Sequence, residues 1–210
     1  MTDGKLTALC NWRVTVRREE VSAVVAQIFG GEQREWQTTG ADRFEVMTGT
    51  SKVKILLAGP CAVAIDMRRW SRGSLVHHCD GEWFLSPESR KGDLCGCPHS
   101  IVERKARVKR GLGPQPNVDL SFRLVDAPDL GVFRMKSISW KFAENASVLK
   151  DAIGSALGES VCGLELEAVE LKGGTRYVKP VLRSLVGYPA DVERNPARPG
   201  ALPGGLGHRH

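Results

Sequence analysis

The sequence has no apolar run long enough to cross a membrane. Its longest apolar stretch, residues 55–65, is interrupted by Gly59 and Pro60, and it falls short of the roughly 18 consecutive apolar residues that a bilayer span requires. The first residues, Met-Thr-Asp-Gly-Lys-Leu, also lack the basic start and apolar core of a secretory signal. We therefore expect a cytoplasmic protein that makes no contact with membranes.

Common catalytic motifs are missing as well. The chain contains no G-x-S-x-G, no phosphate-binding loop ending in Lys-Ser/Thr and no H-E-x-x-H. The His-x-Glu and Pro-Cys-x-x-Cys signatures of zinc deaminases are absent too. His78 and Cys79 do not suit a base and nucleophile pair, because adjacent residues of a strand point to opposite faces. The sequence therefore predicts a protein that is not an enzyme and takes no small-molecule substrate.

The composition is that of a globular protein with a modest excess of positive charge. Of its 210 residues, 41% are hydrophobic and 26% are charged, which fits one ordinary domain. The net charge of +6 permits contact with nucleic acid without requiring it. Much of the basic charge lies in residues 103–110, with smaller clusters at Arg13, Arg17 and Arg18 and at Arg68, Arg69 and Arg72.

Hydrophobic periodicity predicts an α+β fold of mainly antiparallel strands, two amphipathic helices and a small Cys/His metal-binding insertion. Apolar residues at helical spacing predict helices over Glu19–Phe29 and residues 146–157. Alternating patterns and turn signals predict the strands, and Asp80-Gly81 predicts a two-residue hairpin loop. The predicted strands are residues 11–16, 44–47, 52–57, 75–79, 82–85, 120–125, 131–135, 164–171 and 175–182.

We expect residues 1–187 to form a single α+β domain, with the metal-binding and basic insertion at residues 77–116. Residues 188–210 are rich in Pro and Gly and have too few apolar side chains to form a core. The sequence therefore predicts a flexible tail there.

The histidines and cysteines near the middle of the chain favour a metal site. In a cytoplasmic protein, cysteines are more often thiols or metal ligands than disulfides. A strand over residues 75–79 places His77 and Cys79 on one face, and Cys95-Gly96-Cys97 repeats that spacing. Two close pairs separated by a polar loop are typical of a tetrahedral structural zinc site. The predicted ligands are His77, Cys79, Cys95 and Cys97, with His78 or His99 as alternatives to His77.

The remaining side chains of this region are expected to pack. Opposite the ligand face of the hairpin, the pattern assigns Val76, His78, Trp83 and Leu85 to the core. The three other cysteines adjoin apolar runs, where free cysteines usually pack as small apolar side chains. These are Cys10, Cys61 and Cys162.

The basic segment that follows the cysteines predicts a short helix. Ser100 and Glu103 have the spacing of a capping box, and Gly111 is placed to end the helix. Its basic side chains would surround the helix and contact an acidic protein surface or a phosphate backbone without reading sequence; a solvated linker is the alternative. The predicted partner-binding residues are Arg104, Lys105, Arg107, Lys109 and Arg110.

Several short motifs, taken in order, resemble the recombination directionality factors of actinobacterial phages and their uncharacterised bacterial relatives. The resemblance runs over about residues 12–182 and is most specific from Cys-Asp-Gly to Cys-x-Cys-Pro. The motifs are Trp12-Arg-Val-Thr, Val24-Val-Ala-Gln-Ile-Phe-Gly-Gly31, His78-Cys-Asp-Gly81, Cys95-Gly-Cys-Pro98, Glu103-Arg-Lys-Ala, Gly113-Pro-Gln-Pro116 and Gly131-Val-Phe-Arg134.

This resemblance implies an accessory protein of phage or prophage recombination in the cytoplasm of a bacterial host. Such a factor binds a large serine integrase in complex with attachment-site DNA and favours excision over integration. Its own contact with DNA would be weak and non-specific, and the family has no catalytic residues to transfer. The alternative is a zinc-containing nucleic-acid-binding protein of phage replication or transcription control.

Overall fold

The computed structural model describes residues 9–154, 158–170, 174 and 176–184. Its helices are α1 (Glu19–Phe29), α2 (Ile101–Lys109) and α3 (Trp140–Gly154). Its strands are β1 (Arg13–Val16), β2 (Glu32–Glu35), β3 (Phe44–Met47), β4 (Lys52–Leu57), β5 (Val63–Ser71), β6 (Ser74–Cys79), β7 (Phe84–Ser86), β8 (Gln115–Leu124), β9 (Phe133–Ser137), β10 (Ser160–Glu170) and β11 (Arg176–Ser184). The pairings among these strands are antiparallel. The predicted α+β class is therefore confirmed.

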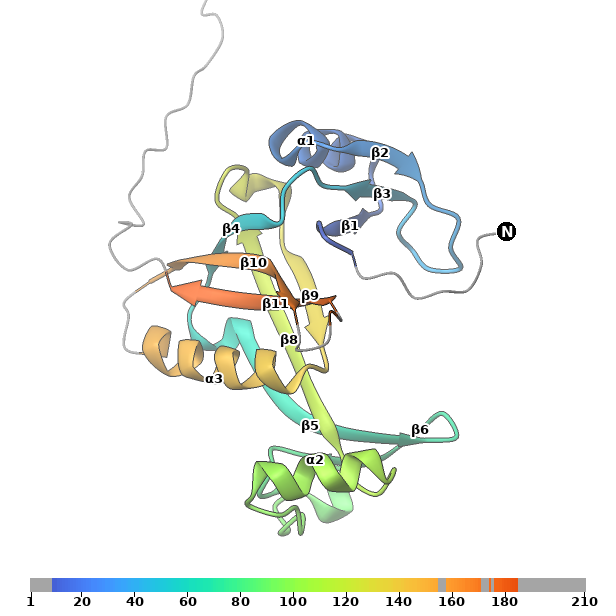
Figure 1. Ribbon diagram of the computed structural model, residues 1–210, viewed down its shortest axis with the longest axis vertical. Helices are drawn as coiled ribbons and strands as arrows, with labels where there is room; N and C mark the ends of the chain where they lie inside the picture. The colour runs from blue at the N-terminus through green and yellow to red at the C-terminus, as the bar shows by residue number, and fades with distance from the viewer. Residues whose placement is uncertain (1–8, 155–157, 171–173, 175, 185–210) are drawn as a thin grey trace, which may run out of the picture.

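The strands form two sheets. A small sheet with the order β1-β3-β2 lies beside α1, and a larger sheet has the order β11-β10-β4-β8-β5-β6-β7, with β9 paired to β8. Figure 1 shows α1 and the small sheet at one end of the molecule and α2 at the other, with α3 against the larger sheet between them. The long strands β5 and β8 connect the central part of the large sheet to the end that carries α2.

The main hydrophobic core lies where α1 and α3 meet the sheets. Val21, Val25 and Phe29 of α1 recur at helical spacing and are buried, which is the amphipathic pattern that the sequence predicts. Helix α3 buries Phe142, Ala146, Leu149 and Ile153 in the same way. These side chains pack with buried apolar residues of the strands, among them Val46, Ile55, Leu57, Leu120, Leu164 and Leu182.

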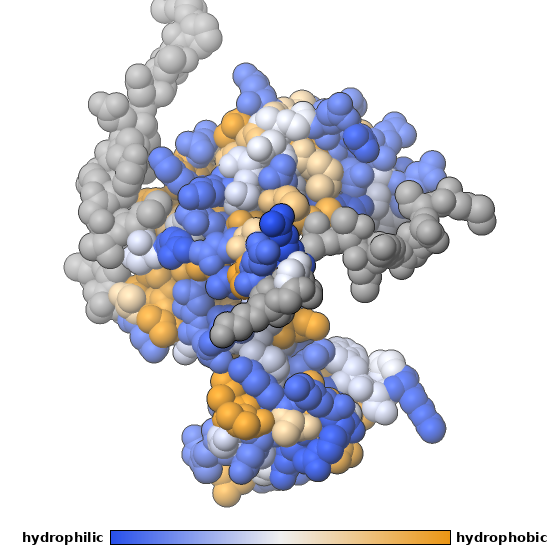
Figure 2. Space-filling view, in the orientation of Figure 1, coloured by the Kyte–Doolittle hydropathy of each residue, from blue (hydrophilic) through white to orange (hydrophobic). Residues whose placement is uncertain are grey.

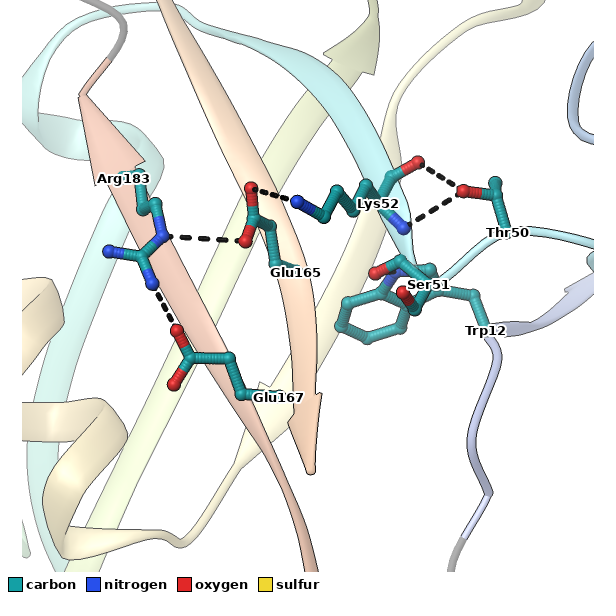
Figure 3. Close-up of polar contacts among 7 residues, drawn as sticks. All are labelled: Trp12, Thr50, Ser51, Lys52, Glu165, Glu167 and Arg183. Atoms are coloured by element: carbon teal, nitrogen blue, oxygen red, sulfur yellow. Dashed lines mark hydrogen bonds and ion pairs between the residues drawn. The ribbon is translucent and has the colours of Figure 1, made fainter. Parts of the chain in front are cut away.

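A partly buried hydrogen-bond network joins the small sheet to the large one, and Figure 3 shows Trp12, Thr50 and Ser51 of this network. The Trp12 Nε1–H donates to the carbonyl of Ser51 over 3.0 Å, and the backbone N–H of Leu166 donates to the same carbonyl over 2.8 Å. The buried hydroxyl of Thr48 accepts from the backbone N–H of Trp12 at 3.0 Å and donates to the carbonyl of Thr50 at 2.7 Å. Because buried polar groups are costly to leave unpaired, this network fixes how the first strand meets the β3–β4 turn.

Next to this network, charged side chains form a row of ion pairs across β4, β10 and β11 (Figure 3). Glu165 lies 3.8 Å from Lys52 and 3.4 Å from Arg183, and Arg183 also pairs with Glu167. Pairs as exposed as these contribute little stability individually. They do match the strand register, in which Lys52 lies opposite Glu165.

The short helix predicted after the cysteines forms as α2, and one helix boundary differs from the prediction, because α3 begins at Trp140 rather than at residue 146. The start of α3 is fixed by Ser139, whose hydroxyl accepts from the backbone N–H of Phe142 at 3.3 Å, as an N-cap does. Strand β2 was not predicted, because Glu-Gln-Arg-Glu has no apolar alternation. The predicted helical residues 155–157 lie outside the described residues.

The tight hairpin of this region is not where Asp80-Gly81 predicts it. Ser71 pairs with Ser74, so the two-residue loop is Arg72-Gly73, with φ of 49° and 79°. Positive φ at both positions is typical of a type I′ turn. Asp80-Gly81 instead belongs to a longer connection, because Cys79 pairs with Phe84.

The Asp80 carboxylate accounts for this longer loop. It accepts from the backbone N–H groups of Glu82 and Trp83 at 2.8 and 2.7 Å, an Asx-turn arrangement that replaces the two-residue hairpin.

Two further expectations concern the whole chain. None of the described helices is long and apolar enough to cross a membrane. The predicted flexible tail, residues 188–210, lies outside the described residues.

Candidate metal centre

The four predicted ligands converge at the end of the molecule that carries α2. His77 and Cys79 belong to β6, and Cys95 and Cys97 belong to the loop that precedes α2. Their ligand atoms all lie within 4.8 Å of one another. We call residues 67–116, which surround this cluster, the metal lobe.

The distances between ligand atoms fit the edges of a tetrahedron around one metal ion. With metal–sulfur bonds of about 2.3 Å and metal–nitrogen bonds of about 2.0–2.1 Å, tetrahedral angles place two sulfurs about 3.8 Å apart and a sulfur and nitrogen about 3.6 Å apart. The Cys79 and Cys97 Sγ atoms are 3.8 Å apart, and Cys97 Sγ lies 3.6 Å from His77 Nε2. The third edge, His77 Nε2 to Cys79 Sγ, is shorter at 3.2 Å. The side chains thus point toward a common centre.

Backbone hydrogen bonds hold the second ligand pair against the β7 segment. The N–H of Cys95 donates to the carbonyl of Glu82 at 2.8 Å, and the N–H of Phe84 donates to the carbonyl of Asp93 at 2.9 Å. Gly96 has a φ of 70°, a conformation that glycine adopts without strain. This turn lets the N–H of Cys97 donate to Cys95 Sγ at 3.4 Å, an outer-sphere contact that orients a metal-binding thiolate.

Without a bound cation, the surroundings favour the neutral forms of the ligands, which are the protonated thiols and the uncharged imidazole. Burial raises the pKa of the Cys79 thiol, and the neighbouring Cys97 raises it further. Burial also raises the pKa of Cys97, with a further contribution from Cys95. Burial lowers the pKa of His77, as do the cations Arg69 and Arg90. A metal ion would supply the positive charge that stabilises thiolates here and would displace their protons.

The structure places His77, rather than His78 or His99, in this cluster. The His78 ring lies on the other face of β6, where Nδ1 is 2.9 Å from the hydroxyl of Ser86 and Nε2 is 3.6 Å from the Asp66 carboxylate. His99 is exposed and is not part of the cluster.

The ligand cluster is also a second, small core. Met67, Cys79, Phe84 and Cys95 are buried together, with Cys97 and Trp140 packed against them. Phe84 lies between the His77 ring, 4.6 Å away, and the guanidinium of Arg90, 3.8 Å from the Phe84 ring centroid.

The predicted orientation of the hairpin is therefore wrong: its ligand face is buried, while Val76, Trp83 and Leu85 are exposed. Because the lobe is small, the thiols fill its interior, and among the described residues no second core forms on the apolar face of the hairpin.

Two arginines of α2 act as internal braces. The Arg104 guanidinium donates to the carbonyl of Pro98 and to the carbonyl of Gly81, the latter over 2.9 Å. Arg107 donates to the carbonyl of Gly96 over 3.2 Å. The helix is capped as predicted, since the Ser100 hydroxyl accepts from the N–H of Glu103 at 3.5 Å. Helix α2 is thus tied to both ligand-bearing turns.

The other three predicted partner-binding residues divide into two kinds. Lys105 lies 3.5 Å from the Glu144 carboxylate and 5.6 Å from the centroid of the Trp140 ring, so it links α2 to α3. Lys109 and Arg110 are exposed, and among the described residues no side-chain partner lies against them. Sequence spacing alone could not separate these roles, because all five cations lie in one short helical segment.

Of the three cysteines outside the cluster, only Cys162 packs as expected. It is fully buried, and burial raises the pKa of its thiol to about 11. Cys10 and Cys61 are exposed, so the expectation that they pack in the interior is wrong. Cys61 lies in the short 3₁₀ turn over Pro60–Ala62 that separates β4 from β5.

The arrangement suits a structural metal rather than a catalytic one. Three cysteines and one histidine complete the four-coordinate shell that structural sites prefer, whereas catalytic sites keep one position open for water or substrate. The ion would sit among buried side chains and hold β6 to the loop before α2.

Comparison with protein families agrees with the sequence resemblance. No solved structure matches the chain. A family model named Gp3-like, described as recombination directionality factor-like, matches residues 3–182. That region contains all four clustered ligands and the whole of α2. The match spans most of the sequence and confirms the predicted family, and the chain therefore belongs to the Gp3-like family of recombination directionality factor-like proteins.

Proposed function

We propose that this protein binds a large serine integrase on attachment-site DNA and favours excision over integration. It would act in the cytoplasm of the bacterial host, as an accessory that performs no chemistry and takes no small-molecule substrate. Family membership supports a role in site-specific recombination. The metal would be zinc, since the donor set of three thiolates and one imidazole is typical of structural zinc.

One observation carries the proposal of a protein partner: exposed apolar side chains concentrate on the metal lobe. Nine of the fourteen large apolar side chains that are exposed among the described residues lie in this lobe. Figure 2 shows such side chains interspersed with hydrophilic ones on the lower part of the molecule. The nine residues are Trp70, Leu75, Val76, Trp83, Leu85, Leu94, Ile101, Val102 and Leu112.

This concentration is typical of a surface that a partner covers. Exposed apolar side chains scattered singly are normal, but gathered ones mark interaction sites. Tryptophan is also enriched among the residues that contribute most to protein–protein binding. A zinc ion would make the surface available by ordering the lobe, because the ligands bind β6 and the loop before α2 into one unit.

The runner-up function, a zinc-containing nucleic-acid-binding protein of phage replication or transcription control, draws support from the unpaired cations of α2. The two functions differ in how tightly the isolated protein is expected to bind DNA. Tight binding to DNA in the absence of integrase, with a steep dependence on salt, would favour it. Dependence of tight binding on the integrase would favour the directionality factor.

A reconstituted recombination reaction tests the proposal. The purified, zinc-loaded protein is added to the large serine integrase encoded nearest to its gene, with excision and integration substrates in parallel. We expect excision to rise and integration to fall, and we expect the protein to co-purify with the integrase–DNA complex. Unchanged product ratios with a verified, active integrase, together with no co-purification, would overturn the proposal.

A matched pair of variants tests the surface itself. Trp83→Ser combined with Leu94→Ser should weaken co-purification, because both side chains are exposed on the metal lobe. Val148→Ser, on α3, should leave it unchanged, although Val148 is 71% exposed and Leu94 is 67% exposed. Equal effects of the two changes would exclude the metal lobe as the docking surface.

A further inference from the structure

We infer that the tip of the β5–β6 hairpin and the C-terminal end of α2 form one surface that binds the phosphate backbone of duplex DNA. Its cations are Arg69, Arg72, Lys109 and Arg110. The inference deepens the proposed function and rests on it for the identity of the DNA, but the binding itself can be measured without an integrase.

Positive charge is concentrated in the two segments that build this surface. Residues 67–79 and 104–118 contain eight lysines and arginines and no acidic residue, whereas the whole chain has a net charge of +6. The rest of the protein is therefore net acidic. A concentration of positive charge in two segments of an otherwise acidic chain is the electrostatic footprint of a polyanion site.

Internal partners hold five of these eight cations, Arg69 included, and leave Arg72, Lys109 and Arg110 without one among the described residues. Arg68 forms two hydrogen bonds of 2.7 and 2.6 Å to the Asp66 carboxylate. Arg104 and Arg107 donate to backbone carbonyls of the ligand-bearing turns, and Lys105 pairs with Glu144. The proposed surface consists of these three cations and Arg69, and among the described residues none of the four pairs with a carboxylate.

A direct hydrogen bond joins the hairpin to the end of α2. The Arg69 guanidinium donates to the carbonyl of Leu112 at 3.1 Å, only two residues after Arg110. Gln115, at the start of β8, lies opposite Arg68 in the strand register. Figure 1 shows α2 and the β6 hairpin at the same end of the molecule, with the hairpin projecting beyond the sheet.

Arg72 occupies a position that the fold alone does not favour for arginine. It is the one non-glycine residue with a positive φ, 49°, among the described residues. This is the first position of the Arg72-Gly73 loop, where Asn, Asp or Gly is accommodated with less strain. Its side chain is exposed at the hairpin tip. A charged side chain held there at a conformational cost points to a role outside the fold.

Weak, salt-dependent binding of the full-length, zinc-loaded protein to a fluorescent random-sequence duplex tests the inference, whereas tight binding without integrase would favour the runner-up function. Four phosphate contacts predict a slope of log K against log salt of about −3 to −4. Arg72→Asn should reduce the magnitude of the slope by about one without lowering the melting temperature, because Asn tolerates the turn better. Arg72→Lys should retain the slope. Arg18→Ala, an exposed arginine beside α1, is the matched control and should change nothing.

Three results would overturn the inference. The first is no salt-dependent binding by the wild-type protein at low salt. The second is an equal effect of Arg18→Ala and Arg72→Asn, which would mean diffuse attraction by the whole protein. The third is unchanged DNA binding by Arg72→Asn together with weaker integrase association, which would assign the cations to an acidic protein surface. The first two results come from measurements without integrase, so they test the DNA-binding surface independently of the proposed function.

Discussion

Removal of the metal is expected to unfold the metal lobe while the main core stays folded. The two buried clusters of the molecule share no residue: one contains α1, α3 and the central strands, and the other contains Met67, Cys79, Phe84 and Cys95. Helix α3 contacts the lobe near its first turn, where Trp140 packs against the small cluster and Lys105 of α2 pairs with Glu144 and lies near the Trp140 ring. Loss of the small cluster should therefore remain local.

The size of the effect on the stability of the lobe follows from how little apolar surface the lobe buries. Apart from the cysteines and from Pro114 and Pro116, its buried apolar side chains are Met67 and Phe84, and each of these two is worth about 1.5–3 kcal/mol. Ordering the backbone costs about 1–2 kcal/mol for every residue fixed, so a few loop residues suffice to cancel that gain. Structural zinc contributes about 10–16 kcal/mol in small modules. Above its dissociation constant, each tenfold rise in free zinc should stabilise the lobe by about 1.4 kcal/mol.

Hydrogen exchange measured by mass spectrometry, in zinc and in chelator, can follow both regions at once. We expect amides of β6, β7 and α2 to lose protection in chelator and in Cys97→Ser, while those of α3 and β10 keep it. Cys61→Ser, which removes an exposed cysteine, should bind one equivalent of zinc and exchange like the wild type. Unchanged protection of the lobe after verified loss of metal would refute the reasoning, and so would loss of protection throughout the chain.

The other predictions test single contacts. Arg104→Ala removes charged hydrogen bonds to two carbonyls and should destabilise the lobe by about 1.5–3 kcal/mol in thermal melts, whereas the exposed Lys109→Ala should stay within about 0.5 kcal/mol. Gly31→Ala would place a Cβ 1.9 Å from the carbonyl oxygen of Met47 at a φ of 105°, so limited proteolysis should show an opened N-terminal sheet. With a pKa near 11, Cys162 has about one thiolate in ten thousand at pH 7. Counted by mass spectrometry, alkylation should modify the two exposed cysteines first, the three ligand cysteines only after chelation, and Cys162 last.

Local patterns in the sequence were sufficient to predict the helix over Glu19–Phe29 and the ligand set. The helix ends match because apolar spacing, acidic residues at its start and Gly30-Gly31 at its end all specify the same segment. The ligands are predictable because each pair is close in the sequence, so one strand and one glycine turn fix its geometry. Only the contact between the two pairs is long-range, and coordination of one metal ion by all four side chains would stabilise that contact directly.

The roles of the basic residues could not be predicted in the same way. Arg104 and Lys109 look alike in the sequence, as cations of one short helix. Their difference arises from which carbonyls the folded loops present: those of Pro98 and Gly81 lie within reach of Arg104, while Lys109 projects from the last turn. The sequence does not show which backbone carbonyls are free to accept a hydrogen bond. A cation that hydrogen-bonds to a loop therefore cannot be distinguished, from the sequence, from a cation that is exposed to solvent.

The hairpin at β6 and β7 buries its ligand face and exposes its apolar face. The physical reason for this arrangement links the candidate metal site to the proposed function. Pattern analysis assigns apolar side chains to the interior, which holds where burial of apolar surface is the main source of stability. In the metal lobe, the candidate ligand side chains occupy the interior, and the free energy of metal coordination would replace much of what apolar packing supplies elsewhere. Val76, Trp83 and Leu85 are thereby released from packing and exposed. A lobe stabilised in this way can present an apolar surface to a partner without losing its own core, which a module of this size without a metal could not do.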